Sequence, residues 1–174
     1  MTMSFAPGMN VFPGGGVSKD DLASADPLLA CAIRETKEEV DIAVPVCHLF
    51  DRWVTPEVED QRFDVSFFVA DTEEVGRLTT TEAVAMRWID PAEALHSHRD
   101  GFLPMLRPTV LILEALASGR VDGQPTAPPV PKLPRRRLDG RWDVVHAETN
   151  DVLVSGVAGP DRAESDGSSM TSEL

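Results

Sequence analysis

The run Arg34-Glu35-Thr36-Lys37-Glu38-Glu39 lies in the longest helix-like stretch of the N-terminal half of the chain. Successive residues of an α-helix are about 100° apart, so Glu38 and Glu39 fall within roughly 60° of Glu35. A neighbouring face can pack against a sheet, and it carries Leu29, Ala32, Ile33, Thr36 and Val40. Three carboxylates therefore share one face of the predicted helix, at the edge of its buried side.

Carboxylates three and four residues apart repel each other and weaken a helix, and Arg34 offsets only part of this repulsion. A bound divalent cation would convert the repulsion into ligation. Magnesium suits such a site because it is a hard ion that takes oxygen ligands and is often shared with phosphates. The alternative interpretation of the run is a solvated acidic face on a surface helix.

A glycine run, Phe12-Pro13-Gly14-Gly15-Gly16, precedes the predicted helix. Glycines let the backbone come close to a ligand, and their N–H and C=O groups can contact phosphate or metal. Three glycines can also form an ordinary loop. The glycines and the acidic helix together, in this order, resemble the signature of the Nudix hydrolase family. The resemblance covers about residues 12–42, and the strands predicted after them fit as well.

The sequence departs from the family pattern at three places. The spacer before Arg34 is about five residues longer than usual. The glutamate expected within it corresponds to Asp21 when counted from the glycines, or to Asp26 when counted back from Arg34. Asp26 precedes a proline and is favoured as a helix cap instead. The glycine expected after the paired glutamates is Asp41, a residue type that tolerates the left-handed conformation.

The resemblance implies a metal-dependent hydrolase that cleaves a diphosphate linkage with Mg²⁺ or Mn²⁺. It implies Glu38 and Glu39 as metal ligands and Glu35 as a ligand or the general base. Arg34 would orient a carboxylate, and the carbonyl group of Gly15 would complete the metal shell.

Further site residues follow from the same resemblance. Glu82 is expected to be an additional ligand or base, and a plain surface glutamate is the alternative. The substrate is expected to contact Arg62 and the glycines Gly14, Gly15 and Gly16.

The fold class expected is α/β, with a Nudix-like mixed sheet between helices. Helices are predicted at residues 27–40, 90–95 and 108–117, and strands at 44–54, 62–70 and 82–89. Residues 1–118 are expected to form the hydrolase domain, with its first strands missing from a short N-terminus. Residues 119–174 are expected to be a proline-rich extension with a hairpin at 142–146 and 152–155 and a disordered tail from 158.

A weaker resemblance, to the coenzyme A and acyl-CoA diphosphatase branch, suggests which diphosphate is the substrate. It rests on the extended spacer, on Arg62-Phe63-Asp64 leading into Phe67-Phe68, and on the proline-rich extension. The alternatives are a pyrophosphatase for nucleoside diphosphate sugars or dinucleotides, and a non-catalytic nucleotide-binding module.

Composition restricts the partners. A net charge of −13 argues against electrostatic binding to nucleic acid or to an anionic membrane. A small diphosphate is then the expected partner, and self-association into a homodimer is left open. Two cysteines give no disulfide framework, and nothing resembles a signal peptide, so a cytoplasmic protein is expected. The cluster Arg135-Arg136-Arg137 is interpreted as a solvated charge patch that balances nearby acids, and binding of phosphate or polynucleotide is the alternative.

Overall fold

The sheet is built from two groups of strands that are far apart in the sequence. The computed structural model describes residues 8–55, 62–119, 132–136, 142–146 and 152–157. Its elements in chain order are η1, a 3-10 helix (Asp21–Ala23), α1 (Pro27–Val40), β1 (His48–Val54), β2 (Asp64–Val69), α2 (Pro91–Arg99), α3 (Arg107–Ala117), β3 (Lys132–Arg136), β4 (Trp142–His146) and β5 (Val152–Val157). The strand order is β2-β1-β3-β4-β5.

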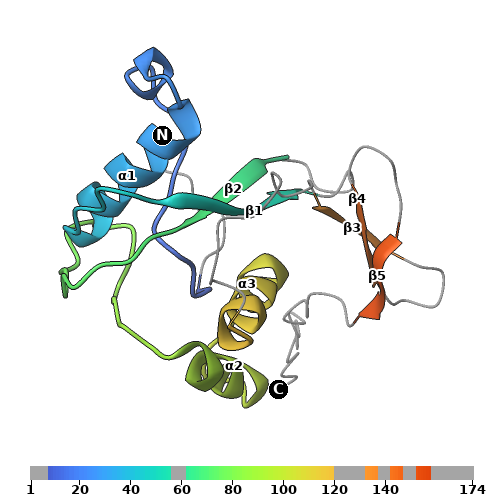
Figure 1. The fold of residues 1–174 in the computed structure, drawn as a ribbon. Helices are drawn as coiled ribbons and strands as arrows, with labels where there is room; N and C mark the ends of the chain where they lie inside the picture. The colour runs from blue at the N-terminus through green and yellow to red at the C-terminus, as the bar shows by residue number, and fades with distance from the viewer. Residues whose placement is uncertain (1–7, 56–61, 120–131, 137–141, 147–151, 158–174) are drawn as a thin grey trace, which may run out of the picture.

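The sheet is mixed, because β1 contacts β3 in parallel while the other strand pairs are antiparallel. Helix α1 lies on one side of the β1–β2 hairpin, and α3 with α2 lies on the other (Figure 1). The predicted fold class, a mixed sheet between helices, is confirmed.

Helix α1 begins and ends at aspartates. The carboxylate of Asp26 accepts a hydrogen bond from the Leu29 N–H at 3.1 Å, and Pro27 occupies the first helical position. At the other end Asp41 adopts the left-handed conformation, with φ of 55°, and donates its N–H to the Lys37 carbonyl group. The predicted helix 27–40 and the capping role of Asp26 are therefore confirmed.

The chain that leaves α1 forms a small apolar core with it. Val40, Ile42 and Val44 are buried together, and partly buried hydrophobic residues pack against them, namely Ile33, Cys47, Ala70 and Met86. This core fixes the end of α1 relative to the start of β1.

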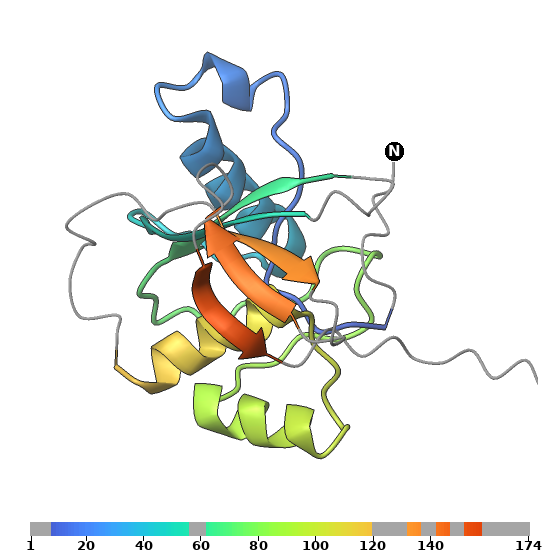
Figure 2. The same cartoon turned by 90° about the vertical axis from the view of Figure 1, so that its right-hand side faces the viewer.

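Strand β1 has neighbours on both edges. The predicted hairpin with β2 is confirmed, with Trp53 opposite Val65. On the other edge Trp53 is level with Lys132 of β3. The Lys132 ammonium group pairs with Asp51 and lies 5.7 Å from the centre of the Trp53 ring, while the Trp53 Nε1–H donates to Asp51 at 3.1 Å. These contacts attach the C-terminal strands to the hairpin (Figure 2).

The predicted hairpin formed by β4 and β5 is confirmed. Val144 and Val145 of β4 are 2% and 0% exposed, so the middle of β4 is buried. The sheet thus joins strands from both predicted segments, 1–118 and 119–174, and their boundary stays a prediction.

Helices α2 and α3 form a second core. Asp90 caps α2 by accepting the N–H groups of Ala92 and Glu93. The core contains Ala94, Leu103, Met105, Val110 and Leu113. The predicted helices at 90–95 and 108–117 are confirmed, with α2 extending to Arg99. None of the helices in the described part of the chain is long and apolar enough to cross a membrane.

The predicted strand at 82–89 is wrong. This segment lies outside the named strands, Val84 is fully exposed, and the Trp88 Nε1–H donates to the Val75 carbonyl group at 2.6 Å. Its apolar side chains pack on two different cores, Met86 on that of Val40, Ile42 and Val44 and Ile89 on that of α2 and α3, so they do not line one face of a sheet.

Two other predicted strands are shorter than expected, since β1 begins at His48 and β2 covers Asp64–Val69. The predicted disordered tail and Arg137 lie outside the described residues, as do the side chains of Arg135 and Arg136.

Candidate active site

The glycine loop packs directly against the acidic face of α1. The Gly14 N–H donates to the Glu39 carboxylate at 3.1 Å. A Cβ atom on Gly15 would lie 2.3 Å from Oε1 of Glu35, so this position accepts a side chain only if Glu35 moves. The Gly15 carbonyl group accepts the Cys31 thiol at 3.6 Å. The glycine run and the acidic run, which together carry the resemblance in the sequence, are therefore in contact.

Arg34 connects the glycine loop to two of the glutamates. Its Nη1 donates to Glu35 at 2.8 Å and to Glu38 at 2.9 Å, and its Nη2 donates to the Gly16 carbonyl group at 3.1 Å. On its other side the guanidinium group forms an ion pair of 2.8 Å with Asp21. One side chain thus orients two carboxylates and the loop.

Asp21 is the partner that anchors Arg34. It is only 5% exposed, and its carboxylate also accepts the Ser18 N–H at 2.7 Å. The hydrogen bonds from Arg34 hold the pKa of Asp21 far below its usual range, and the bond from Ser18 adds to this effect. The structure therefore separates the two spacer aspartates: Asp21 holds Arg34, and Asp26 caps α1.

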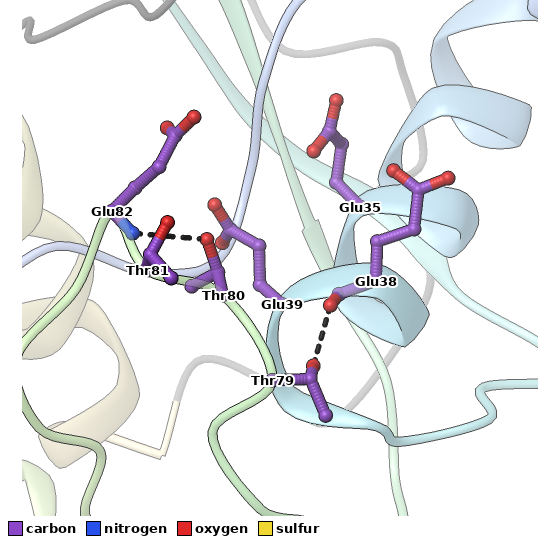
Figure 3. Close-up of a pocket in the computed structure, with 7 residues that line it drawn as sticks. All are labelled: Glu35, Glu38, Glu39, Thr79, Thr80, Thr81 and Glu82. Carbon is purple, nitrogen blue, oxygen red and sulfur yellow. Dashed lines mark hydrogen bonds between the residues drawn. The ribbon is translucent and has the colours of Figure 1, made fainter.

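A loop of three threonines closes the other side of the carboxylate face. We call residues 76–82 the threonine loop. Together with α1 it forms a shallow, open pocket of about 350 Å³ lined by Glu35, Glu38, Glu39, Thr79, Thr80, Thr81 and Glu82. Figure 3 shows these residues on α1 and on the loop facing it. The structure therefore brings Glu82 to the same pocket as the three glutamates of α1.

The electrostatics of the pocket are those of clustered carboxylates. Burial raises the pKa of Glu39 above its ordinary value, and the charges of Glu35, Glu82 and Glu38 raise it further, while the hydrogen bond from Gly14 opposes the rise. None of the seven lining residues is Lys or Arg. An anionic substrate would therefore enter this pocket together with a cation.

The carboxylates of the candidate ligands do not converge on one point. Within the described residues, no group of three or more His, Cys, Asp or Glu side chains is arranged so that it could hold a metal ion. The reason is visible in the contacts, since Glu35 and Glu38 bind Arg34 and Glu39 binds the Gly14 N–H. A site shared by three carboxylates requires rotation of these side chains, of which Glu38 is the most exposed at 59%.

Arg62 does not line this pocket. Its Nε donates to the Thr55 carbonyl group at 3.3 Å, just before β2 begins. Conversely, the threonines of the loop were not singled out from the sequence. The consecutive run Thr79-Thr80-Thr81 directly before Glu82 was the signal that could have pointed to them.

Comparison with known proteins identifies the family of the chain. A family model of the NUDIX domain matches residues 3–107, which is more than half of the chain. No curated protein and no solved structure matches the chain. The matched region contains the glycine loop, the acidic helix and the threonine loop. The chain therefore belongs to the Nudix family, and it is a pyrophosphohydrolase that acts on acid anhydrides.

Proposed function

We propose that the pocket between α1 and the threonine loop is the site of a divalent-metal-dependent hydrolysis of a diphosphate linkage. The observation that carries the proposal is the set of four carboxylates lining one pocket with no basic side chain among the lining residues. Carboxylate oxygens are the donors that Mg²⁺ and Mn²⁺ prefer, so the donor chemistry of the pocket fits either ion.

We assign Glu38 and Glu39 as metal ligands, with the Gly15 carbonyl group completing the shell, and Glu35 as a ligand or the general base. A metal bound here would neutralise phosphate charge and lower the pKa of a coordinated water molecule. Support for these roles comes from the shared pocket of the glutamates and from the proximity of Gly15 to Glu35.

The surrounding residues prepare these carboxylates. Arg34 holds Glu35 and Glu38 by hydrogen bonds of 2.8 and 2.9 Å, and the Gly14 N–H holds Glu39. Glu82 approaches from the opposite side of the pocket and is assigned as an additional base or ligand. The ion pairs with Arg34 offset part of the repulsion among the glutamates.

We further propose coenzyme A or an acyl-CoA as the substrate, cleaved into a phosphopantetheine and an adenosine 3′,5′-bisphosphate. Support comes from the sequence features of that branch, among them Phe67. In the structure Phe67 and Phe12 form an edge-to-face pair with ring centres 6.4 Å apart, next to the glycine loop. Gly14, Gly15 and Gly16 would contact the diphosphate, and Arg62, outside the pocket, a distal part of the substrate.

The test is a substrate panel analysed by chromatography of the products. The panel contains coenzyme A, an acyl-CoA, ADP-ribose, a nucleoside diphosphate sugar and a dinucleotide, each with Mg²⁺, with Mn²⁺ and with EDTA. Metal-dependent cleavage of coenzyme A above the other compounds is the expected result. Preferred cleavage of a sugar nucleotide or dinucleotide would assign the pocket to that substrate class. Hydrolysis that persists in EDTA would contradict the metal site itself.

A further inference from the structure

The threonine loop is attached to the last turn of α1 by main-chain contacts. The Arg77 N–H donates to the Val40 carbonyl group at 2.8 Å, and the Thr79 N–H donates to the Glu39 carbonyl group at 2.8 Å. The Thr79 hydroxyl group donates to the Glu38 carbonyl group. The last carbonyl groups of a helix have no partner within the helix, so the loop satisfies three consecutive ones.

Gly76 makes this attachment possible. It has a positive φ of 67°, and a Cβ atom there would lie 2.6 Å from the Val40 carbonyl oxygen and from the Ile42 side chain. Arg77 adds an ion pair of 3.0 Å to Asp41, the residue that terminates α1. The loop is therefore closely packed on the helix end at its first residues, several positions before Glu82.

The attachment involves the same residues that present the candidate ligands. Glu38 and Glu39 point their carboxylates into the pocket and give their carbonyl groups to Thr79. Beyond Thr79 the loop turns, with the Glu82 N–H donating to the Thr80 hydroxyl group at 3.1 Å. Figure 3 shows Thr79 below the carboxylates, with its hydroxyl group toward the main chain of Glu38.

The carboxylate of Glu82 differs from the other three in the pocket. Among the described residues it has no hydrogen-bond or ion-pair partner, whereas Glu35 and Glu38 have Arg34 and Glu39 has the Gly14 N–H. Its position relative to the helix is therefore set by its main chain alone, and Thr79 is the last residue before it that binds α1.

We propose that Thr79 is a positioning residue, which holds the threonine loop on α1 so that Glu82 faces the carboxylates of Glu38 and Glu39. The inference rests on the proposed function, in which Glu82 acts in the pocket. Thr79 itself does not contact the reacting atoms. Small displacements of a reacting group lower rates strongly, by up to about a hundredfold for roughly 1 Å.

The experiment compares three variants of the full chain. Thr79→Val removes the hydroxyl group at nearly constant volume, and Thr79→Ser retains it. Thr72→Val is the matched control, because the Thr72 hydroxyl group accepts the Glu74 N–H at 3.1 Å outside the pocket. We expect Thr79→Val to lower kcat about tenfold with KM within about twofold, and Thr79→Ser and Thr72→Val to keep kcat within about twofold.

A double variant shows whether Thr79 acts through Glu82. If it does, Thr79→Val combined with Glu82→Gln is as slow as Glu82→Gln alone. If the two substitutions lower kcat independently, so that their losses multiply in the double variant, the proposal is contradicted. A Glu82→Gln variant with the parental kcat would also contradict it, even where hydrolysis still requires the metal.

A second readout does not depend on activity. The exchange rate of the Glu82 amide proton, followed by NMR, should rise at least about tenfold in Thr79→Val and stay at the parental value in Thr79→Ser and Thr72→Val. An unchanged rate in Thr79→Val would overturn the positioning role. This readout also separates the proposed function from the proposed role of Thr79. If the parent hydrolyses no member of the panel, the proposed function is contradicted, and the exchange rate still decides whether Thr79 positions Glu82.

Discussion

The segment that follows β2 contains the same short turn twice, with different consequences. In both copies a threonine hydroxyl group accepts the N–H of the glutamate two residues later at 3.1 Å, first Thr72 with Glu74 and then Thr80 with Glu82. The Glu74 carboxylate accepts the Ala43 N–H at 2.9 Å and attaches the segment to the chain after α1. The Glu82 carboxylate has no such partner among the described residues and lines the pocket. The surroundings, and not the local sequence, separate a structural glutamate from a candidate catalytic one.

The largest effect is expected outside both turns, at Glu39 on the acidic face of α1. Glu39→Gln keeps the size of the side chain and removes the charge of one proposed metal ligand. Activity should fall by about a hundredfold or more at saturating Mg²⁺, because the metal stabilises developing phosphate charge. The melting temperature in EDTA should hold or rise, since repulsion on that face of α1 is relieved. Hydrolysis at the parental rate would show that the acidic face is only structural.

The two turns themselves are compared by changing each glutamate to glutamine. Glu82→Gln should lower kcat by about tenfold to a hundredfold, because the proposed function assigns this carboxylate as a base or ligand. The melting temperature should change little, because the carboxylate has no partner among the described residues. Glu74→Gln should keep kcat and lower stability by about 1 kcal/mol, since it weakens a hydrogen bond to the main chain. Equal effects of the two substitutions on kcat would remove the distinction between the turns.

An effect on stability and not on the chemical step is expected where the second turn is attached to the helix. Gly76→Ala should lower the free energy of unfolding by about 2 kcal/mol or more, because positive φ is unfavourable for alanine and the methyl group meets the Val40 carbonyl oxygen. Gly101→Ala is the matched control, with φ of 80° and open space around the added atom, and should cost about 1 kcal/mol. Urea denaturation of both variants measures the difference, which vanishes if the loop is not packed on α1.

The smallest effect concerns a carboxylate held by a side chain at the surface. Arg52 holds the pKa of Asp64 below its ordinary value by hydrogen bonding. The pair should contribute at most about 1 kcal/mol, fully present above the unfolded pKa of about 4 and lost as the pH falls through the folded pKa. Asp64→Asn should therefore melt slightly below the parent at pH 7, and the gap should close below about pH 4. A gap that widens on acidification would contradict the pairing.

The sequence predicted those features that depend on neighbouring residues. The start of α1 at Asp26 and Pro27 and its end at Asp41 are local capping signals, and both are correct. The proximity of the glycines to the glutamates followed from a family pattern with the same order. The roles assigned to these residues remain predictions.

The features that the sequence did not predict depend on contacts between residues far apart in the chain. Residues 82–89 were predicted to form a strand, but Met86 and Ile89 of this segment pack on two different cores, which only the fold brings near it. Counting along the spacer could not choose between Asp21 and Asp26, because only the fold shows which carboxylate meets Arg34. The threonine loop was missed because its contacts with α1 join residues 41 positions apart, as between Thr79 and Glu38.

The parallel contact between β1 and β3 also bears on how the chain is made. Lys132 and Asp51 are 81 residues apart, so this edge of β1 stays open on the ribosome until the C-terminal strands have been synthesised. Contacts between distant residues slow folding, and an open strand edge can pair with other chains in the meantime. Synthesis of the last strands therefore sets the earliest moment at which the nascent enzyme is protected from aggregation through this edge.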